Sequence, residues 1–502
     1  MRGLLPAGAF LLGLGVFLLG EHQLAGVAGF PLDDSWIHFQ FARNLAEGHG
    51  FSYNPGVPVA GSTAPLWTLT LGALFAVTGS HPLLAKLLGA AASLGAALLT
   101  GRLARSWSGD PAAALLAASL AALSAPLLWG ALSGMEVSLA ALLVAAGLLA
   151  HTRGRELAAA VLLALAVLAR PEAILVLGLT WAAGPLAPGR TARYALAGVV
   201  IIGPWVAFNL VTGGTPLPAT AAAKIEGGLA GFLAGAREPA ARIFFARPWD
   251  FSKEWARWLW DVNGLLPFLI VIGLGLLWSR GGRRLGLPAT ALLLQPLAMA
   301  LLAPYRGPAF QEGRYVIHLI PLAFATAMLP VAALGRAREI AGLAHLRRLL
   351  AAGLAAAALV SLWPAATRYG WAVQNIEAMQ VRLARWVNAH APLDARLALN
   401  DVGAIGYLSQ RPVIDVMGLV TPAILPYKKE GEDGVLRYLE RACPDYLIVF
   451  PAWFPRLTAM GDRFTPVERV RLTRNTVAGA EEMVVYETVW SRAHPGARPC
   501  PR

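Results

Sequence analysis

Charged residues are scarce in this sequence. Asp, Glu, Lys and Arg make up 14% of the 502 residues, whereas 57% are hydrophobic and the mean hydropathy is +0.56. A soluble globule of this length needs more polar surface than this composition supplies. The composition therefore excludes an ordinary soluble protein and indicates a polytopic membrane protein.

Cysteine is almost absent, because Cys443 and Cys500 are the two in the chain. This excludes a Cys-rich zinc site and a disulfide framework, and it leaves one bridge at most. No His-x-x-x-His or similar spacing favours zinc either. If the C-terminal region lies in an oxidising compartment, the two cysteines can pair.

Arginine supplies nearly all of the basic residues behind the formal net charge of +13. The arginines recur between apolar runs, without the aromatic and basic platforms that bind single-stranded nucleic acid, so we expect no nucleic-acid partner. We interpret them as cytoplasmic orientation signals, which requires an even number of crossings between neighbouring sets. The sets are Arg2, then Arg102 and Arg105, Arg153 and Arg155, Arg190 and Arg193, Arg280 with Arg283 and Arg284, and finally Arg336, Arg338, Arg347 and Arg348.

This parity rule predicts about eleven transmembrane helices and an external C-terminal domain. We interpret the first apolar run as a retained span rather than a cleaved signal peptide. The run Pro65 to Val77 is too short for a hydrocarbon core of roughly 30 Å, so we expect a juxtamembrane or re-entrant helix on the outer side. The predicted crossings are residues 4–19, 83–100, 112–130, 137–150, 157–169, 173–183, 194–210, 265–278, 285–303, 315–334 and 349–363.

The predicted topology divides the chain into two domains. A transmembrane domain, residues 1–365, contains a large first external loop, 21–61, in which Ser35 to Ala46 has the amphipathic spacing of an interfacial helix. Arg170 falls at a tip below the outer surface, which requires a wet cavity. Residues 366–502 are predicted to form a soluble extracytoplasmic α/β domain, with strand-like pieces at 396–399, 412–416, 446–450 and 483–488.

Titratable residues collect on the outer face in this topology. Asp33 and Asp34 are adjacent acids beside a span, which cost free energy unless they face water, a partner or a substrate. A carboxylate there can take a proton from an attacking hydroxyl, while cations stabilise a departing phosphate. We expect Asp33 and Asp34 to be catalytic, with Asp33 as the base. The residues expected to bind substrate are Lys224, Arg314, Glu136, Arg170, Glu172, Arg43 and His49.

Short motifs with a common origin run through most of the chain. They are Asp33-Asp34-Ser35-Trp36-Ile37, Arg43-Asn44-Leu45, Gly48-His49-Gly50, Asn54-Pro55-Gly56, Gly61-Ser62-Thr63-Ala64-Pro65-Leu66-Trp67, Ser133-Gly134-Met135-Glu136, Arg170-Pro171-Glu172, Pro216-Leu217-Pro218 ending in Lys224, Arg314-Tyr315, and the tail pieces Asn400 to Tyr407 and Asp415. Together they resemble the GT-C membrane glycosyltransferases, in particular the bacterial arabinofuranosyltransferase branch.

This resemblance implies a GT-C-like fold and an inverting glycosyltransferase of the bacterial inner membrane. The implied donor is a polyprenyl-phosphate sugar, and the acceptor is a hydroxyl of an envelope glycan, lipid or protein on the extracytoplasmic face. Ser35, Trp36, Ala64 and Ala219 depart from the family's usual residues. These departures leave the sugar and the acceptor open.

Each candidate residue also has a plainer interpretation. An acid before an amphipathic run is a good helix N-cap, and we expect Asp34 to cap a helix that begins near Ser35. Lys224 suits an interfacial lysine that reaches the headgroups, and Arg314 suits a surface ion pair. The two glutamates at positions 136 and 172 suit helix N-termini, where the dipole favours acids.

Metal dependence and transport are the remaining alternatives. Asp33, Asp34 and Glu312 offer oxygen ligands of the kind that magnesium or manganese accepts, so the cofactor stays open. His49 is favoured as loop structure over a metal ligand. A transporter or flippase for lipid-linked sugars is the alternative function, but it needs charges near the bilayer midplane. The predicted topology keeps the charges outside.

The orientation can be tested with single cysteines and an impermeant thiol reagent in intact cells. Cysteines at Ser35, Gly228 and Gly431 should react, and one at Gly281 should not. Reaction at Gly281 would contradict the parity argument and with it the shared external face.

Overall fold

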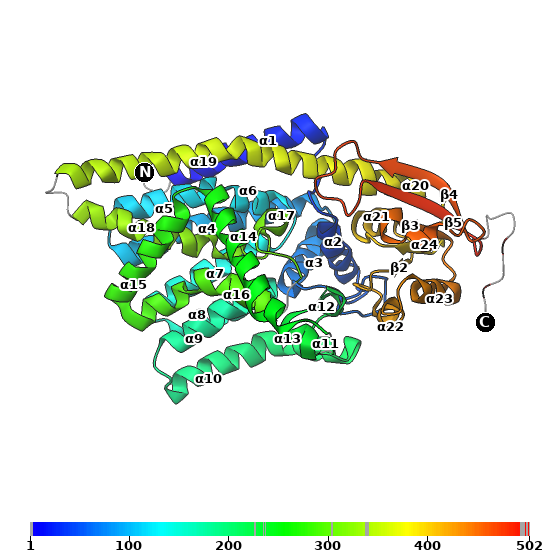
Figure 1. The fold of residues 1–502 in the computed structure, drawn as a ribbon, viewed down its shortest axis with the longest axis horizontal. Helices are drawn as coiled ribbons and strands as arrows, with labels where there is room; N and C mark the ends of the chain where they lie inside the picture. The colour runs from blue at the N-terminus through cyan, green and yellow to red at the C-terminus, as the bar shows by residue number, and fades with distance from the viewer. Residues whose placement is uncertain are drawn as a thin grey trace.

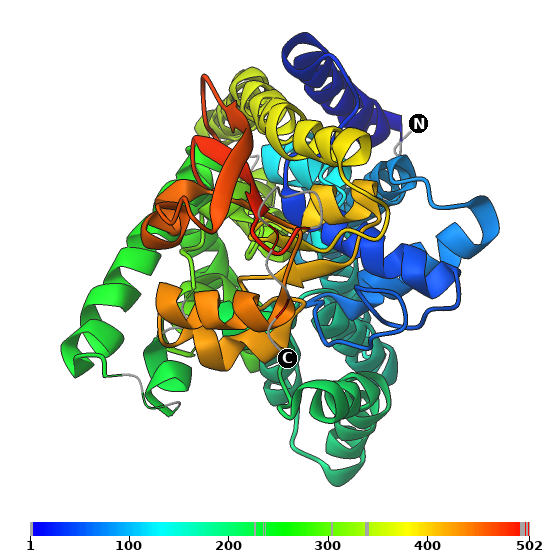
Figure 2. The ribbon, with the colours of Figure 1, turned by 90° about the vertical axis from the view of Figure 1, so that its right-hand side faces the viewer.

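The computed structural model describes residues 4–224, 227–233, 235, 237–302, 305–336, 341–491, 497 and 500. It has a long helical bundle with a small α/β domain at one end (Figure 1). Viewed from the side of that domain, its sheet and helices lie in front of the ends of the bundle helices (Figure 2). The predicted fold class, a polytopic helical membrane protein with a C-terminal α/β domain, is confirmed.

Apolar helices form the bundle. They are α1 (Leu4–Ala25), α4 (Leu83–Ser108), α5 (Pro111–Leu123) with α6 (Ala125–Leu132), α7 (Val137–Thr152), α8 (Glu156–Ala169), η1 (Pro171–Ala173) with α9 (Ile174–Ala183), α10 (Pro188–Ala197) continued by η2 (Gly198–Ile202) and α11 (Gly203–Gly213), α15 (Leu266–Ala289), α16 (Ala291–Leu302), η4 (Ile317–Leu319) with α18 (Ile320–Arg336), and α19 (Ala341–Ile376).

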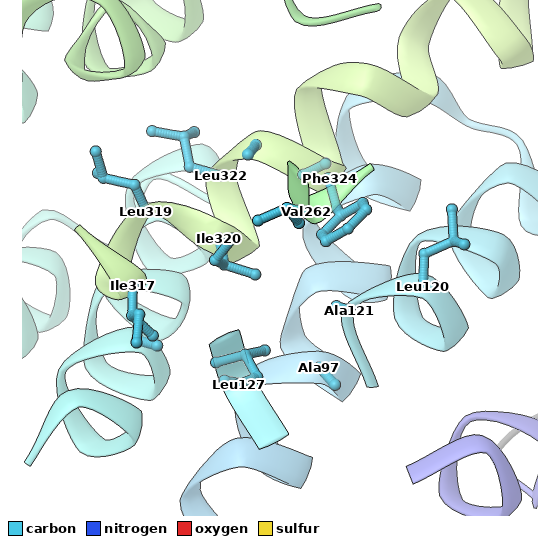
Figure 3. Packing of buried hydrophobic residues seen from close by; sticks show 14 of the residues in the cluster. Ala97, Leu120, Ala121, Leu127, Val262, Ile317, Leu319, Ile320, Leu322 and Phe324 are labelled. Carbon is cyan, nitrogen blue, oxygen red and sulfur yellow. The ribbon is translucent and has the colours of Figure 1, made fainter. Parts of the chain in front are cut away.

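Small and large side chains alternate where these helices pack. Figure 3 shows Ala97 of α4 and Ala121 of α5 near Leu127 of α6 and Phe324 of α18, all buried. Without a hydrophobic driving force between helices in lipid, such close packing of small residues supplies much of the attraction. At Gly273 of α15, an added Cβ would collide with the backbone oxygen of Thr326, so glycine sets this crossing.

The described residues contain six helices long and apolar enough to cross a membrane, or seven if the bent pair α5 and α6 is one span. The shorter apolar helices are α3 (Pro65–Thr78), α7, α8 and η1 with α9. The backbone of α15 is non-helical at Gly282, with φ 50°, where two crossings were predicted to meet. The crossing predicted at 285–303 begins inside α15, which also contains the crossing predicted at 265–278, and it continues through α16. The number of crossings stays a prediction.

Connections rich in arginine lie at the end of the bundle far from the α/β domain, on the left in Figure 1. Arg347 pairs with Asp110 at 2.6 Å, and Arg190 pairs with Glu156 at 3.1 Å. Arg284 donates to the backbone oxygen of His151 at 3.1 Å. These arginines therefore fasten helix ends together, and this arrangement is compatible with the predicted parity.

Short helices cover the opposite end of the bundle. They are α2 (Asp33–Ala46), α3, α12 (Ala219–Lys224), α13 (Gly228–Leu233), η3 (Arg242–Ala246), α14 (Arg247–Val262) and α17 (Phe310–Gly313). The prediction of an interfacial helix after Ser35 is wrong, because every residue from Ser35 to Asn44 is buried between α3 and the α/β domain. Ser35 and Gly228 are buried, so the exposed Gly431 is the external position best suited to the cysteine test.

The α/β domain contains one sheet in the order β2-β1-β3-β5-β4. Strands β2, β1 and β3 are parallel, and β5 and β4 continue the sheet in antiparallel fashion. Its elements are η5 (Glu377–Val381), α20 (Arg382–His390), β1 (Leu397–Leu399), α21 (Gly403–Ser409), β2 (Val413–Asp415), η6 (Pro422–Ile424), α22 (Leu425–Lys428), α23 (Glu432–Ala442), β3 (Tyr446–Val449), η7 (Pro451–Trp453), α24 (Pro455–Thr458), β4 (Phe464–Arg471) and β5 (Glu482–Thr488).

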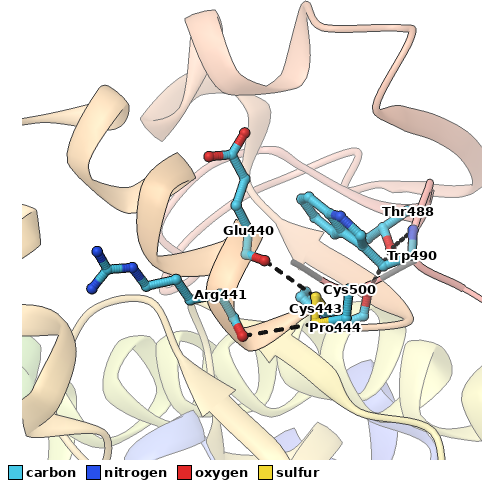
Figure 4. The surroundings of a disulfide bond; sticks show 7 residues. All are labelled: Glu440, Arg441, Cys443, Pro444, Thr488, Trp490 and Cys500. Carbon is cyan, nitrogen blue, oxygen red and sulfur yellow. Dashed lines mark hydrogen bonds between the residues drawn. A yellow bond between two sulfur atoms is a disulfide. The ribbon is translucent and has the colours of Figure 1, made fainter. Parts of the chain in front are cut away.

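The four predicted strands are present, and β4 was missed. This edge strand carries Pro466 and charged side chains and exposes most of its residues, so it lacks the apolar signal of a central strand. The predicted boundary at residue 365 stays a prediction, since α19 runs through it to Ile376 and leads directly into η5. The cysteine pairing is confirmed: Cys443 and Cys500 form a disulfide with Cα atoms 5.9 Å apart (Figure 4).

Candidate active site

A cavity of about 1000 Å³ lies where the bundle meets the α/β domain. Its walls come from the start of α2, the segment around α17, the C-terminal part of α19 and the loops of the α/β domain. The charged residues that line it are Asp33, Asp34, Arg306, Glu312, Arg314, Arg368, Asp401, Lys428 and Arg474. Both predicted catalytic acids and Arg314 are therefore in one cavity.

Asp33 binds the α/β domain. Its carboxylate accepts the backbone N–H of Gly403 at 2.6 Å and that of Ala404 at 2.7 Å, at the start of α21. An added Cβ at Gly403 would collide with the backbone oxygen of Asp33, so glycine permits this approach. Burial and the neighbouring carboxylate of Asp401 raise the pKa of Asp33 well above its usual value, against the two N–H bonds. Asp33 thus acts as a cap for a helix 370 residues away.

Asp34 faces the cavity beside a cation. Its Oδ2 accepts from Nη1 of Arg314 at 2.7 Å, and its side chain is 33% exposed whereas that of Arg314 is 5% exposed. The expectation that Asp34 caps a helix is wrong, because α2 begins one residue earlier and has no side-chain cap. Arg314 does form an ion pair, as its plainer interpretation predicted, but the pair with Asp34 is partly buried at the cavity wall and not on the open surface.

A buried charge network supports this pair. The guanidinium carbons of Arg314 and Arg170 lie 5.1 and 4.9 Å from the ring centre of Tyr315. Arg170 bonds Glu136 at 2.5 Å and Glu172 at 2.9 Å. Ion pairing inside the protein, rather than the expected wet cavity, therefore satisfies Arg170 at this depth.

The same network continues to α2. His38 Nε2 lies 3.4 Å from Glu136, and His38 Nδ1 lies 3.1 Å from the hydroxyl oxygen of Thr68 on α3. The glutamates at 136 and 172 and Arg170 do not line the cavity. The structure brings the two glutamates together around Arg170, whose guanidinium lies over the ring of Tyr315, the neighbour of Arg314.

Arg43 and His49 are not at the cavity wall. Arg43 donates to the backbone oxygen of Tyr407 at 3.0 Å and lies 4.3 Å from the centre of that ring, which joins α2 to α21. His49 is exposed and lies 3.7 Å from Glu47. Lys224 ends α12, and its side chain lies outside the described residues.

Four cavity cations were missed by the sequence analysis: Arg306, Arg368, Lys428 and Arg474. Arg368 makes two bonds to Glu312, at 2.9 and 3.1 Å. The other three have no carboxylate within 4.0 Å among the residues that the structure describes. Arg306 lies three residues after the predicted crossing 285–303 and directly follows Tyr305, a signal that the sequence contains, whereas the others depend on the folding of distant segments.

The α/β domain contributes two further acids. Asp401 accepts from Gln380 Nε2 at 2.8 Å, and burial raises the pKa of Asp401 to about 6. Asp415 accepts the backbone N–H of Met417 and Val420, both at 2.8 Å, as a turn residue does. Over the described part of the chain, no group of three or more His, Cys, Asp or Glu is arranged to hold a metal ion. Acids and cations are instead interleaved around the cavity.

We compared the sequence and the fold with those of known proteins. Residues 374–490 match a family model described as a domain of unknown function, DUF8728. No curated protein matches the sequence. ArnT from Cupriavidus metallidurans, solved with undecaprenyl phosphate, matches at 14% identity with a TM-score of 0.57, over 95% of this chain and 98% of ArnT.

A second solved structure also has a similar fold. The archaeal oligosaccharyltransferase AglB from Archaeoglobus fulgidus, in complex with an inhibitory peptide and a dolichol-phosphate, matches at 13% identity with a TM-score of 0.55. The match covers 97% of this chain and 74% of AglB. Both are GT-C glycosyltransferases, and the likeness extends through the bundle and the α/β domain. This chain therefore has the fold of the GT-C membrane glycosyltransferases, as its sequence motifs predicted.

Proposed function

We propose that this protein is an inverting glycosyltransferase that moves a sugar from a polyprenyl-phosphate donor to a hydroxyl acceptor. The observation that carries the proposal is the cavity itself, whose walls contain the acid Asp34 and three cations that have no acidic partner among the described residues. An acid and free cations around one cavity suit a reaction that removes a proton at one point and releases a phosphate at another.

The reaction balances with these groups alone. The acceptor hydroxyl oxygen attacks the anomeric carbon, the bond from that carbon to the phosphate oxygen breaks, and its electron pair leaves with the phosphate. Asp34 takes the hydroxyl proton. The arginines and Lys428 stabilise the charge on the phosphate monoester, which is a good leaving group and needs no general acid, unlike the leaving alcohol of an ordinary glycoside.

Asp34, rather than Asp33, is the proposed base. Each oxygen of Asp33 already accepts a backbone N–H, so that side chain is held against α21. Asp34 is a third exposed and lines the cavity, so a hydroxyl of a bound acceptor can reach its carboxylate. Asp33 then becomes a positioning residue that holds the two halves of the site together.

The network behind Tyr315 has a supporting role in this proposal. Glu136, Glu172 and Arg170 fix Tyr315 and through it Arg314, instead of contacting substrate themselves. Lys224 stays a proposed phosphate ligand. His49 has no place in this mechanism.

The donor class, the compartment and the sugar rest on different observations. The ArnT structure contains undecaprenyl phosphate and the AglB structure a dolichol-phosphate, which supports a phosphorylated polyprenyl carrier here. We place the cavity on the extracytoplasmic face of the bacterial inner membrane because the arginine-rich connections lie at the other end. Arabinofuranose as the sugar, and an envelope acceptor, rest on the sequence motifs.

Substituting the two acids separates their roles. Asp34→Asn keeps the side chain's size but removes the proton acceptor, so transfer should fall roughly 10²-fold or more while donor binding survives. Asp250→Asn, on the exposed surface of α14, should transfer normally. Full transfer by Asp34→Asn would contradict its assignment as the base, and the absence of any glycosidic product from the wild-type protein would favour a carrier instead.

Asp33→Asn tests the positioning role through hydrogen exchange. An amide offers one acceptor oxygen where the carboxylate offers two, so one of the N–H groups at Gly403 and Ala404 loses its partner. We expect these amides to exchange about tenfold faster, consistent with the roughly 1 kcal/mol of an ordinary hydrogen bond. Exchange should be unaltered in Asp34→Asn. Equal protection in Asp33→Asn and wild type would contradict the cap.

The unpaired cations should bind the phosphate. Arg306→Gln and Arg474→Gln should each weaken binding of undecaprenyl phosphate about tenfold, because a charge-assisted bond is lost in the ground state as well as the transition state. Arg469→Gln, which removes an exposed arginine of β4 from a surface pair with Glu482, is the matched control. Unchanged affinity in both cavity variants would exclude these residues from phosphate binding.

A further inference from the structure

The parallel part of the α/β sheet turns one particular edge to the cavity. In the order β2-β1-β3, the next strand in the chain after β1, which is β2, lies on one side of β1, and the strand after that, β3, lies on the other side. The carboxyl end of β1 is therefore a topological switch point. Ligands of open α/β sheets bind in the crevice at such a point. Asn400 follows β1, Met417 follows β2 and Trp453 follows β3, and all three line the cavity. We call these residues, with Gln380, the carboxyl edge.

The anion position of this edge is already filled. A helix that follows the first strand of such a sheet offers its N-terminal N–H groups to an anion. Here that helix is α21, and the carboxylate of Asp33 accepts those N–H groups. A phosphate therefore has no place at the N-terminus of α21, and the side chains of the carboxyl edge, namely Asn400, Gln380, Met417 and Trp453, are uncharged.

Two amide side chains at the carboxyl edge lack partners. Asn400 is 3% exposed, and neither atom of its amide has a hydrogen-bond partner within the described residues. Gln380 is fully buried and donates to Asp401, while its Oε1 has none. Native proteins pair nearly all buried polar atoms, because an unpaired one costs about 1–3 kcal/mol. Three unpaired atoms at one cavity wall point to a missing ligand.

The chemistry of these atoms selects the ligand class. An amide both donates and accepts, as a sugar hydroxyl does, whereas a phosphate accepts only. Trp453 adds a large apolar surface beside them: it is 42% exposed, and its Nε1 donates to the backbone oxygen of Gly479 at 3.1 Å, which fixes the ring. A rigid aromatic ring with a few convergent polar groups is typical of a small-molecule site.

We propose that the carboxyl edge is a saccharide-binding site that holds the acceptor through Asn400, Gln380 and Trp453. The assignment to the acceptor rests on the proposed function, since the unpaired cations of the cavity account for the donor phosphate. Saccharide binding itself does not require catalysis. The site presents a hydroxyl of the bound saccharide to the same cavity that Asp34 lines.

The experiment measures saccharide binding and stability on the full-length protein without donor. The probes are methyl glycosides and linear trisaccharides, detected by saturation-transfer NMR. Asn400→Leu should weaken binding of the best probe about tenfold, which corresponds to one or two hydrogen bonds. Its thermal unfolding temperature should equal or exceed that of wild type, because an unpaired buried amide is replaced by an apolar group of similar size.

Asn44→Leu is the matched control. Asn44 is also buried, but its amide donates to the backbone oxygens of Ser52 and Tyr53, both at 2.8 Å, and it is not at the cavity. We expect a lower unfolding temperature with probe affinity unchanged. Trp453→Ala should weaken binding, whereas Trp363→Ala, an exposed tryptophan of α19, should not.

The outcomes are distinguishable. Wild-type affinity in both Asn400→Leu and Trp453→Ala, a stability loss in Asn400→Leu equal to that in Asn44→Leu, or no binding of any probe to the wild-type protein would overturn the site. A wild-type protein that binds a saccharide at these residues but transfers no sugar would contradict the proposed function and leave the site standing.

Discussion

Asp33 begins the first helix after the first span, and its carboxylate accepts two N–H groups at the start of α21 in the other half of the molecule. An acid at this depth is costly unless it is bonded, and the N-terminus of a helix is a favourable environment for a negative charge. This contact joins the bundle to the α/β domain in one register, and the cavity lies between the two halves that it joins.

Neighbouring contacts depend on the same register. Asn54 exchanges two bonds with the backbone of Val413, at 2.8 and 2.9 Å, and Tyr53 donates to the backbone oxygen of Val402. These bonds tie the first external loop to β2 and to the turn before α21. Asp34, one residue after Asp33, is then directed to the cavity, where Arg314 is within bonding distance. One carboxylate of the pair joins the two halves, and the other lines the cavity.

Much of the fold follows from the sequence, and the site follows in part. Apolar runs fix the helices of the bundle, since about 20 apolar residues have few alternatives in a membrane. Short, largely apolar runs located four strands, but β4 has the composition of an exposed edge and gives no such signal. The amphipathic spacing of α2 predicted a surface helix, and the burial of both its faces is a tertiary effect that spacing alone does not contain.

The sequence predicted some of the residues at the cavity and missed others. The sequence analysis found Asp33, Asp34 and Arg314 because adjacent acids and a lone arginine beside apolar runs are conspicuous. The sequence favours Asp33 as the base, whereas our proposal assigns that role to Asp34. The N–H groups that hold Asp33 belong to Gly403 and Ala404, residues that carry no sign of an acidic partner. Lys428 and Arg474 resemble ordinary surface cations until the fold brings them to the cavity.

The position of Arg474 illustrates how the cavity wall is completed. The loop from β4 to β5 is held by Asn375 of α19, which donates to the backbone oxygen of Arg474 at 2.8 Å and accepts from the N–H of Thr476 at 2.7 Å. The guanidinium of Arg474 lies 4.9 Å from the ring centre of Trp371 on the same helix. Because α19 runs from the bundle into the domain without a break, it fixes this loop relative to Asp34 as well. A rigid helix thus helps to place Arg474 of the α/β domain and Asp34 of the bundle in one cavity, and the reaction that we propose requires a cation and an acid in this arrangement.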